Sequence, residues 1–199
     1  MPQKTVLCKL RGSLKRCRLL PEATGSQLLE FALVLPFLLV LLTGIIDFGY
    51  AFNLKQKLNN AAREGARLAA TEEVYCSGNG QAPCIPAPDS VQAVRDEVAN
   101  YLTNAGLNGC VVATTATYAA TNQAWTYSSS STGCNSFSLK VETGFTYANG
   151  GTTVVASRVT LSYPYAWVFF NRIIGLLVSG SSYGSSITIT TDAIMQNLP

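Results

Sequence analysis

A chain of 199 residues, 48% of them hydrophobic, can form one domain of ordinary size with an anchor or tail, which excludes a second full domain. Its net charge of +3 does not predict a nucleic-acid-binding protein, because the basic excess lies at the N-terminus and no aromatic residues are interleaved with it. The basic residues before Gly25 are Lys4, Lys9, Arg11, Lys15, Arg16 and Arg18. We expect this segment to contact a translocation machine or an anionic membrane surface, and no nucleic acid.

A long apolar run follows the basic segment. Residues 31–51 carry a single charge, Asp47, and are enough to cross a hydrocarbon core of about 30 Å as a helix. The basic residues before the run favour a cytoplasmic N-terminus, with residues 53–199 on the other side. A secretory signal peptide is the alternative. It fits less well, because the run is longer than a usual signal region and residues 47–50 offer no small-x-small cleavage pattern.

The helix is expected to continue past the membrane and to cover residues 28–70. Leu54, Leu58, Ala61, Gly65 and Leu68 recur at spacings of four and three, so they lie on one face. Such a helix is about 65 Å long at 1.5 Å per residue and extends beyond the bilayer. We expect its distal half to pack on its own domain and its proximal half to contact other subunits.

The C-terminal part of the chain predicts one more helix and a sheet. Gly and Pro in residues 77–89 indicate a loop, and an apolar face indicates a helix at roughly 90–105. Strand-forming residues then dominate, and the candidate strands are 110–119, 136–147, 152–163 and 186–195. The sequence ANGG at 148–151 predicts a hairpin turn, and residues 122–133 predict a polar loop. The apolar segment 162–178 is either a core helix or a surface that lies on the membrane or a partner.

These elements predict the α+β fold class: a long N-terminal transmembrane helix that continues into a small periplasmic domain with a second helix and an antiparallel sheet of about four strands. The predicted division of the chain is a basic leader peptide (1–25), the long helix (26–70, with the span at about 31–51) and an extracytoplasmic domain (71–199).

The cysteines agree with this topology. Cys8 and Cys17 lie in the leader, and four cysteines lie in the exported part, where an oxidising compartment permits disulfides. Four cysteines allow three pairings, and the sequence does not choose among them. We favour Cys76 with Cys84 and Cys110 with Cys134. A zinc site is the alternative, but the chain has no CxxC pair and no histidine, so we expect no metal and no cofactor.

Glu30 stands at the entrance of the apolar run. Burying a carboxylate there costs several kcal/mol unless it is paired, and one interpretation is that it is solvated at the lipid headgroups. A second interpretation starts from Gly25, five residues upstream. Cleavage after Gly25 would create an α-amino cation on Ser26, and Glu30 of one subunit could neutralise the Ser26 amine of a neighbour.

This arrangement resembles the processing site of type IV pilins and pseudopilins: a short basic leader, Gly25, Ser26, then Glu30, Phe31 and an apolar helix. The resemblance implies that a prepilin peptidase removes the leader at the cytoplasmic face of the bacterial inner membrane. The sequences EFALVLP, GIIDFG and AAREGARLAA within residues 24–70 look like the TadE family of the tight-adherence (Tad/Flp) pilus machinery. The later RVTLSYPY and ITITTDAIM are similar to the C-terminal pattern of that family.

Two further residues of the span have alternative interpretations. Pro36 can kink the helix or melt a turn, although membrane helices tolerate proline widely. Asp47 lies near the outer end of the span, where it can pair with a basic residue of a neighbouring subunit or reach water.

The chain is therefore expected to be a minor pilin or pseudopilin acting in pilus assembly and adhesion. The implied partners are a prepilin peptidase, other pilin or pseudopilin subunits, an inner-membrane assembly platform and membrane lipid. One alternative is a single-pass anchor of the secretion apparatus that never enters a filament. Another is a membrane-anchored adhesin that uses Trp125 and Tyr127 of the predicted polar loop as contacts. No enzyme is expected, because the chain lacks histidine, a phosphate-binding loop and a GxSxG motif.

Overall fold

The computed structural model describes residues 7–10, 13–16, 22–71, 86–129, 131–169 and 186–197. Within these residues the chain forms two helices, α1 (Glu22–Thr71) and α2 (Asp89–Asn104). A short antiparallel pair, β1 (Leu7–Leu10) and β2 (Ser13–Arg16), precedes them. The remaining strands are β3 (Val112–Ala119), β4 (Ala124–Ser129), β5 (Ser138–Asn149), β6 (Thr152–Ala166) and β7 (Ser186–Gln196). The predicted α+β class is confirmed.

The chain divides into two compact units, Met1–Ile46 and Asp47–Pro199. The first contains the N-terminal half of α1, which is long and apolar enough by composition to cross a membrane. No residue between Gly25 and Ile46 is buried. Thr43 lies in this half and donates its hydroxyl to the carbonyl of Val40 at 2.9 Å, so its polar group is satisfied within the helix. An N-terminal apolar helix of this kind fits a single-pass membrane protein.

The second half of α1 belongs to the globular unit, called the body below. Its buried apolar side chains are Leu54, Leu58, Ala61, Ala62, Ala66 and Ala69. Most of them are small, so the helix backbone lies close to its neighbours. At Gly65 the approach is close: a Cβ atom would lie 2.7 Å from Cγ2 of Val98 in α2 and 3.5 Å from Cγ1 of Val159 in β6. The predicted packing of the distal half on its own domain is confirmed.

Helix α2 ends at a tight cap that α1 helps to complete. Gly106 has a φ of +77°, the left-handed conformation that glycine adopts readily. The backbone N–H of Leu107 donates to the carbonyl of Leu102 at 2.8 Å, which satisfies a carbonyl of the last helical turn. From α1, Lys57 donates through Nζ to the carbonyl of Ala105 at 2.8 Å. A cation at this end of a helix is favourable because the helix dipole is negative there.

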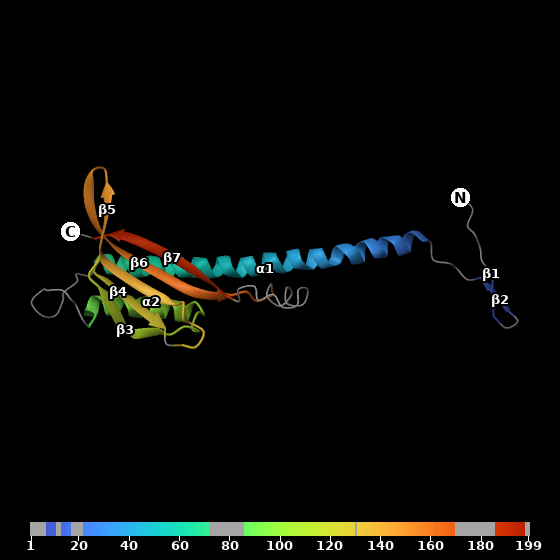
Figure 1. Cartoon of the computed structure of the whole chain (residues 1–199), viewed down its shortest axis with the longest axis horizontal. Helices are drawn as coiled ribbons and strands as arrows, with labels where there is room; N and C mark the ends of the chain where they lie inside the picture. The colour runs from blue at the N-terminus through green and yellow to red at the C-terminus, as the bar shows by residue number, and fades with distance from the viewer. Residues whose placement is uncertain are drawn as a thin grey trace, which may run out of the picture. The chain divides into compact units, whose positions relative to one another are not determined.

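Strands β3 to β7 form an antiparallel sheet in the order β3-β4-β5-β6-β7, so strands that follow one another in sequence are neighbours in space (Figure 1). Trp125, Val141, Val159 and Ala193 oppose one another in successive strands and join the core that contains both helices. The turn between β5 and β6 uses Gly150 and Gly151, both with positive φ. The hairpin turn predicted at 148–151 is confirmed.

The sheet has five strands where about four were predicted, because β4 lies in the segment expected to be a polar loop. Trp125 and Tyr127 of β4 are fully buried, while Thr126 between them lies on the opposite face. The serines that follow Tyr127 hide this short alternation in the sequence. The prediction that Trp125 and Tyr127 are exposed adhesin contacts is therefore wrong.

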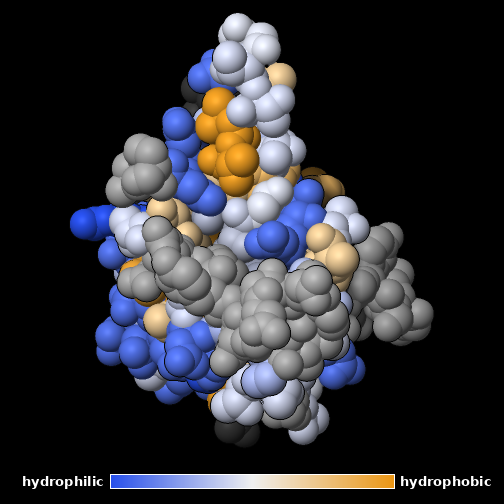
Figure 2. All heavy atoms as spheres, turned by 90° about the vertical axis from the view of Figure 1, so that its left-hand side faces the viewer, coloured by the Kyte–Doolittle hydropathy of each residue, from blue (hydrophilic) through white to orange (hydrophobic). Residues whose placement is uncertain are grey.

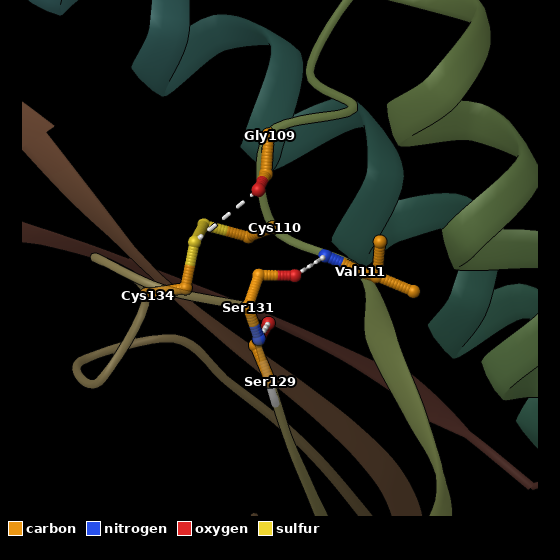
Figure 3. Close-up of a disulfide and its surroundings, with 6 residues drawn as sticks. All are labelled: Gly109, Cys110, Val111, Ser129, Ser131 and Cys134. Atoms are coloured by element: carbon orange, nitrogen blue, oxygen red, sulfur yellow. Dashed lines mark hydrogen bonds between the residues drawn. A yellow bond between two sulfur atoms is a disulfide. The ribbon is translucent and has the colours of Figure 1, made fainter.

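A disulfide between Cys110 and Cys134 joins the chain ahead of β3 to the connection between β4 and β5 (Figure 3). The bond closes a loop across a sequence separation of 24 residues. Beside it, Ser131 accepts a hydrogen bond through Oγ from the backbone N–H of Val111 at 3.2 Å. This is one of the two pairings that the sequence favoured. Cys76 and Cys84 lie outside the described residues. Residues 170–178, the second part of the apolar segment 162–178, also lie outside them.

The body is mainly polar on the face that Figure 2 shows. The figure views it from the left-hand side of Figure 1, where hydrophilic and intermediate side chains dominate and apolar ones form small patches. The outer face of the sheet has the same character, with Thr117, Thr126, Lys140, Thr160 and Asp192 opposing one another across the five strands. Only the opposite face of the sheet contributes to the helix-covered core.

The close approach at Gly65 gives the first testable prediction. In Gly65→Ala the new methyl group meets the stiff, buried side chain of Val98, and we expect a loss of about 1 kcal/mol after the better helix propensity of alanine is counted. Gly49→Ala is the matched control, because nothing lies within 4 Å of its Cβ position. Thermal unfolding of both variants in detergent, followed by near-ultraviolet circular dichroism, measures the difference. An unfolding midpoint for Gly65→Ala as high as that of Gly49→Ala would contradict the close packing.

Candidate functional site

The predicted processing and assembly residues all lie at the start of α1. Gly25, Ser26, Glu30 and Phe31 are exposed, and nothing lies within 4 Å of a Cβ atom placed on Gly25. The helix begins at Glu22 and continues through the Gly25–Ser26 peptide bond. Ser26 and Glu30 are four residues apart, so they lie on the same side of the helix in successive turns. The structure therefore places a small residue, the bond after it and the carboxylate on one accessible stretch.

Pro36 lies inside this exposed half of α1. The residues on both sides of it remain helical, so the prediction of a melted turn does not hold in this structure. Proline in a helix leaves one carbonyl of the preceding turn without its N–H partner, and membrane helices absorb this through local adjustment.

Asp47 is the first buried residue of α1, with 0% of its surface exposed. Its Oδ1 atom accepts hydrogen bonds from the backbone N–H groups of Val168 and Phe169, both at 3.2 Å, and Oδ2 accepts from Phe169 at 3.1 Å. In return Tyr165 donates its hydroxyl to the backbone carbonyl of Asp47 at 3.0 Å. The prediction that Asp47 reaches water is wrong, because the end of β6 covers the carboxylate.

Aromatic rings surround this contact. The ring of Phe48 meets that of Trp167 edge to face, with centroids 5.5 Å apart, and Tyr165 meets Trp167 in the same way at 5.4 Å. Edge-to-face pairs of this kind add about 0.5–1.5 kcal/mol beyond the area that they bury. The sequence analysis did not identify these rings as partners, because residues 48 and 167 come together only once β6 lies along α1.

A second buried carboxylate lies on the outer face of the sheet. Glu142 of β5 is 1% exposed and pairs with Nε of Arg158 at 2.5 Å and Nζ of Lys140 at 3.0 Å. Asn122 donates to it at 3.3 Å, and the Arg158 guanidinium also lies 4.1 Å from the centre of the Phe145 ring. The sequence analysis missed this cluster, whose only sequence signal is a glutamate and an arginine within two predicted strands.

The electrostatics of Glu142 follow from these contacts. Burial alone would raise its pKa, but the hydrogen bonds from Arg158, Lys140 and Asn122 outweigh burial and lower the pKa to about 2. Glu142 reciprocally raises the pKa of Arg158. Because every charge has an opposite partner within the body, this cluster stabilises the β5–β6 contact and offers no unpaired group to a ligand.

The low pKa of Glu142 predicts how stability depends on pH. The unfolded chain binds the Glu142 proton more tightly than the folded chain, so the stabilisation is present at neutral pH and is lost as pH falls from about 5 towards 2. In Glu142→Gln this contribution is absent, and we expect stability to fall less steeply over the same range. Denaturant unfolding of the full chain at a series of pH values, followed by tryptophan fluorescence, measures the two slopes.

Glu97→Gln is the control for that experiment, because Glu97 is an exposed acid on α2. Parallel pH profiles for wild type and Glu142→Gln would show that the ion pair does not form in solution.

No metal site emerges from the described residues. Among them, no three His, Cys, Asp or Glu side chains lie close enough together to hold a metal ion. The buried acids Asp47 and Glu142 are separately engaged by backbone amides and by basic side chains.

The match with a protein family coincides with α1. The family model of TadE-like proteins matches residues 25–67, and TadE-like proteins are associated with Tad pili. No curated protein and no solved structure matches the chain. The matched segment begins at Gly25, includes Glu30, Pro36 and Asp47, and ends two residues after the close packing point at Gly65. The body beyond α1 lies outside the match.

Proposed function

We propose that the chain is a minor pilin or pseudopilin of a Tad-type pilus or secretion system, acting in pilus assembly and adhesion. A prepilin peptidase cleaves it between Gly25 and Ser26, and the mature subunit is held in the inner membrane by α1 with the body on the extracytoplasmic side. Other pilin subunits and an inner-membrane assembly platform are its partners. The observation that carries this proposal is the TadE-like match over residues 25–67.

The two halves of α1 differ in burial, and this difference supports the proposal. From Leu54 onward the helix buries a face in its own body, whereas most apolar side chains between Leu28 and Ile46 are exposed and none is buried. Lipid can cover that exposed half before assembly, and other subunits can cover it afterwards. Lipid chains are as apolar as leucine, so burial of apolar surface alone does not drive helices together in a membrane. Assembly therefore needs an additional attraction.

Glu30 and the new N-terminus provide that attraction. An α-amino group has a pKa of about 8 and is cationic at neutral pH, whereas the nitrogen of Ser26 in the uncleaved chain is a neutral amide. Cleavage thus creates the charge that complements Glu30. A carboxylate held among apolar helices is costly when unpaired, so the pair favours one axial position of neighbouring subunits over others.

Processing is the first test of the proposal. We expect the chain recovered from membranes of cells that express the cognate peptidase to begin at Ser26, as measured by intact mass and N-terminal sequencing. Gly25→Leu should block cleavage, because a large side chain replaces the small residue next to the scissile bond. Gly44→Leu is the control, since Gly44 is also a helical glycine with no atom within 4 Å of its Cβ position. A wild-type chain that begins at Met1 or Pro2 would instead support a permanent single-pass anchor.

Assembly is the second test. Glu30→Ala should leave membrane insertion unchanged and greatly reduce the amount of subunit recovered in filaments sheared from the cell surface. Glu64→Ala removes an acid from the same helix at an exposed position whose ion pair with Arg67 is long, 3.8 Å, and should assemble normally. Equal recovery of Glu30→Ala and Glu64→Ala in filaments would refute the role of Glu30.

A further inference from the structure

The end of β6 is fixed to a helix position that lies inside the apolar run. Residues 31–51 form that run, and Asp47, which holds the amides of Val168 and Phe169, comes four residues before its end. Four helical residues correspond to about 6 Å along the axis. In a chain whose α1 spans a bilayer, Trp167, Val168 and Phe169 are therefore held at the level where the hydrocarbon core meets the headgroups.

The side chains at this level are those that favour such a boundary. Val168 is 48% exposed and Phe169 is 41% exposed, and Phe48 and Phe52 of α1 are also exposed large apolar residues. Trp167, which meets the ring of Phe48 edge to face, is an amphipathic ring of the kind enriched at membrane interfaces. The face in Figure 2 is mainly polar by comparison.

The hydrogen bonding of Asp47 suits an edge that lies against lipid. In water, neither a carboxylate nor a backbone amide at the end of a strand needs a protein partner. In a medium of low polarity both are costly when unpaired. Asp47 and the amides of Val168 and Phe169 satisfy each other, and the Tyr165 hydroxyl is satisfied by the carbonyl of Asp47. The polar groups at this edge are thus paired internally while its apolar side chains point outward.

We propose that Trp167, Val168 and Phe169 form an interfacial membrane contact, through which the body rests on the bilayer that α1 spans. The occupant of this surface is the boundary between lipid headgroups and acyl chains. Asp47 is a positioning residue, because it acts through the backbone of the segment that meets the lipid. This inference requires only that α1 spans a membrane, and it holds whether or not the chain is cleaved or enters a filament.

The two tryptophans of the chain make the contact measurable. Trp125 lies in the core and Trp167 lies at the proposed contact. The full chain is reconstituted in phosphatidylethanolamine and phosphatidylglycerol vesicles that contain lipids brominated either close to the headgroup or near the middle of the acyl chain. In Trp125→Phe, whose emission comes from Trp167 alone, we expect strong quenching by the first lipid and weaker quenching by the second. Trp167→Phe reports Trp125 and should be quenched by neither.

Two results would overturn the proposal. Quenching of Trp167 by aqueous acrylamide without quenching by brominated lipid would place this edge in water. Protection from both quenchers would place it against protein, such as a second copy of the chain. If Trp125→Phe does not fold, subtracting the emission of Trp167→Phe from that of the wild type isolates the same signal.

A variant of Asp47 tests the positioning role separately. Asp47→Leu removes the acceptor of the two amides, and we expect Trp167 to lose much of its quenching by lipids brominated near the headgroup. Emission from Trp125 in the double variant with Trp167→Phe reports whether the core remains intact. Unchanged lipid quenching of Trp167 in Asp47→Leu would show that Asp47 does not hold the segment at the membrane. N-terminal sequencing of the same material shows whether the chain starts at Ser26. This result separates a failure of the membrane-contact proposal from a failure of the processing proposal.

Discussion

The packing of the second half of α1 against α2 and β6 is the constraint from which the rest of the body follows. A Cβ atom on Gly65 would lie 2.7 Å from Val98, and the alanines at positions 61, 62, 66 and 69 are buried on either side of it. Helix packing at such short range fixes which residues of β6 lie beside which turn of α1. The hydrogen bond from Ser157 to the carbonyl of Ala69 and the contact of Asp47 with residues 168 and 169 lie at opposite ends of this contact. The antiparallel course of α1 along β6 is therefore held at both ends and in the middle.

Three acidic side chains of this protein have different kinds of partner, and the differences reflect the medium around each. Glu142 lies on a sheet face that borders water and is neutralised by two basic side chains, an arrangement that suits a surface from which water is only locally excluded. Asp47 lies within the apolar run and accepts hydrogen bonds from backbone amides, which stabilise its carboxylate in a region where charge is costly. Glu30 is exposed at the start of the run, and the proposed function assigns it a partner from another subunit.

Local signals in the sequence were sufficient for the elements that depend on local physics. The apolar run and the spacing of Leu54, Leu58 and Ala61 predict α1, and the Asn-Gly-Gly turn predicts the β5–β6 hairpin, because each pattern acts over a few residues. β4 was missed since its serines resemble a loop and its burial is decided by β3 and β5. The partners of Asp47 could not be predicted, because Val168 is 121 residues away in sequence and only the register of β6 on α1 brings them together. The Glu142–Arg158 pair has the same origin in the pairing of β5 with β6.

The two proposals together constrain how such a subunit can leave the membrane. Moving Val168 and Phe169 from lipid to water would cost about 1.5–3 kcal/mol for each side chain if it were fully exposed, and this figure is reduced to the share of each surface that is accessible, 48% and 41%. Asp47 would not compensate for that cost, since its bonds to the backbone persist whatever covers the side chains. A subunit that moves from bilayer to filament must therefore exchange the lipid at this edge for protein, in addition to the lipid along the N-terminal half of α1. Covering the apolar helix alone would leave Val168 and Phe169 with apolar surface facing water.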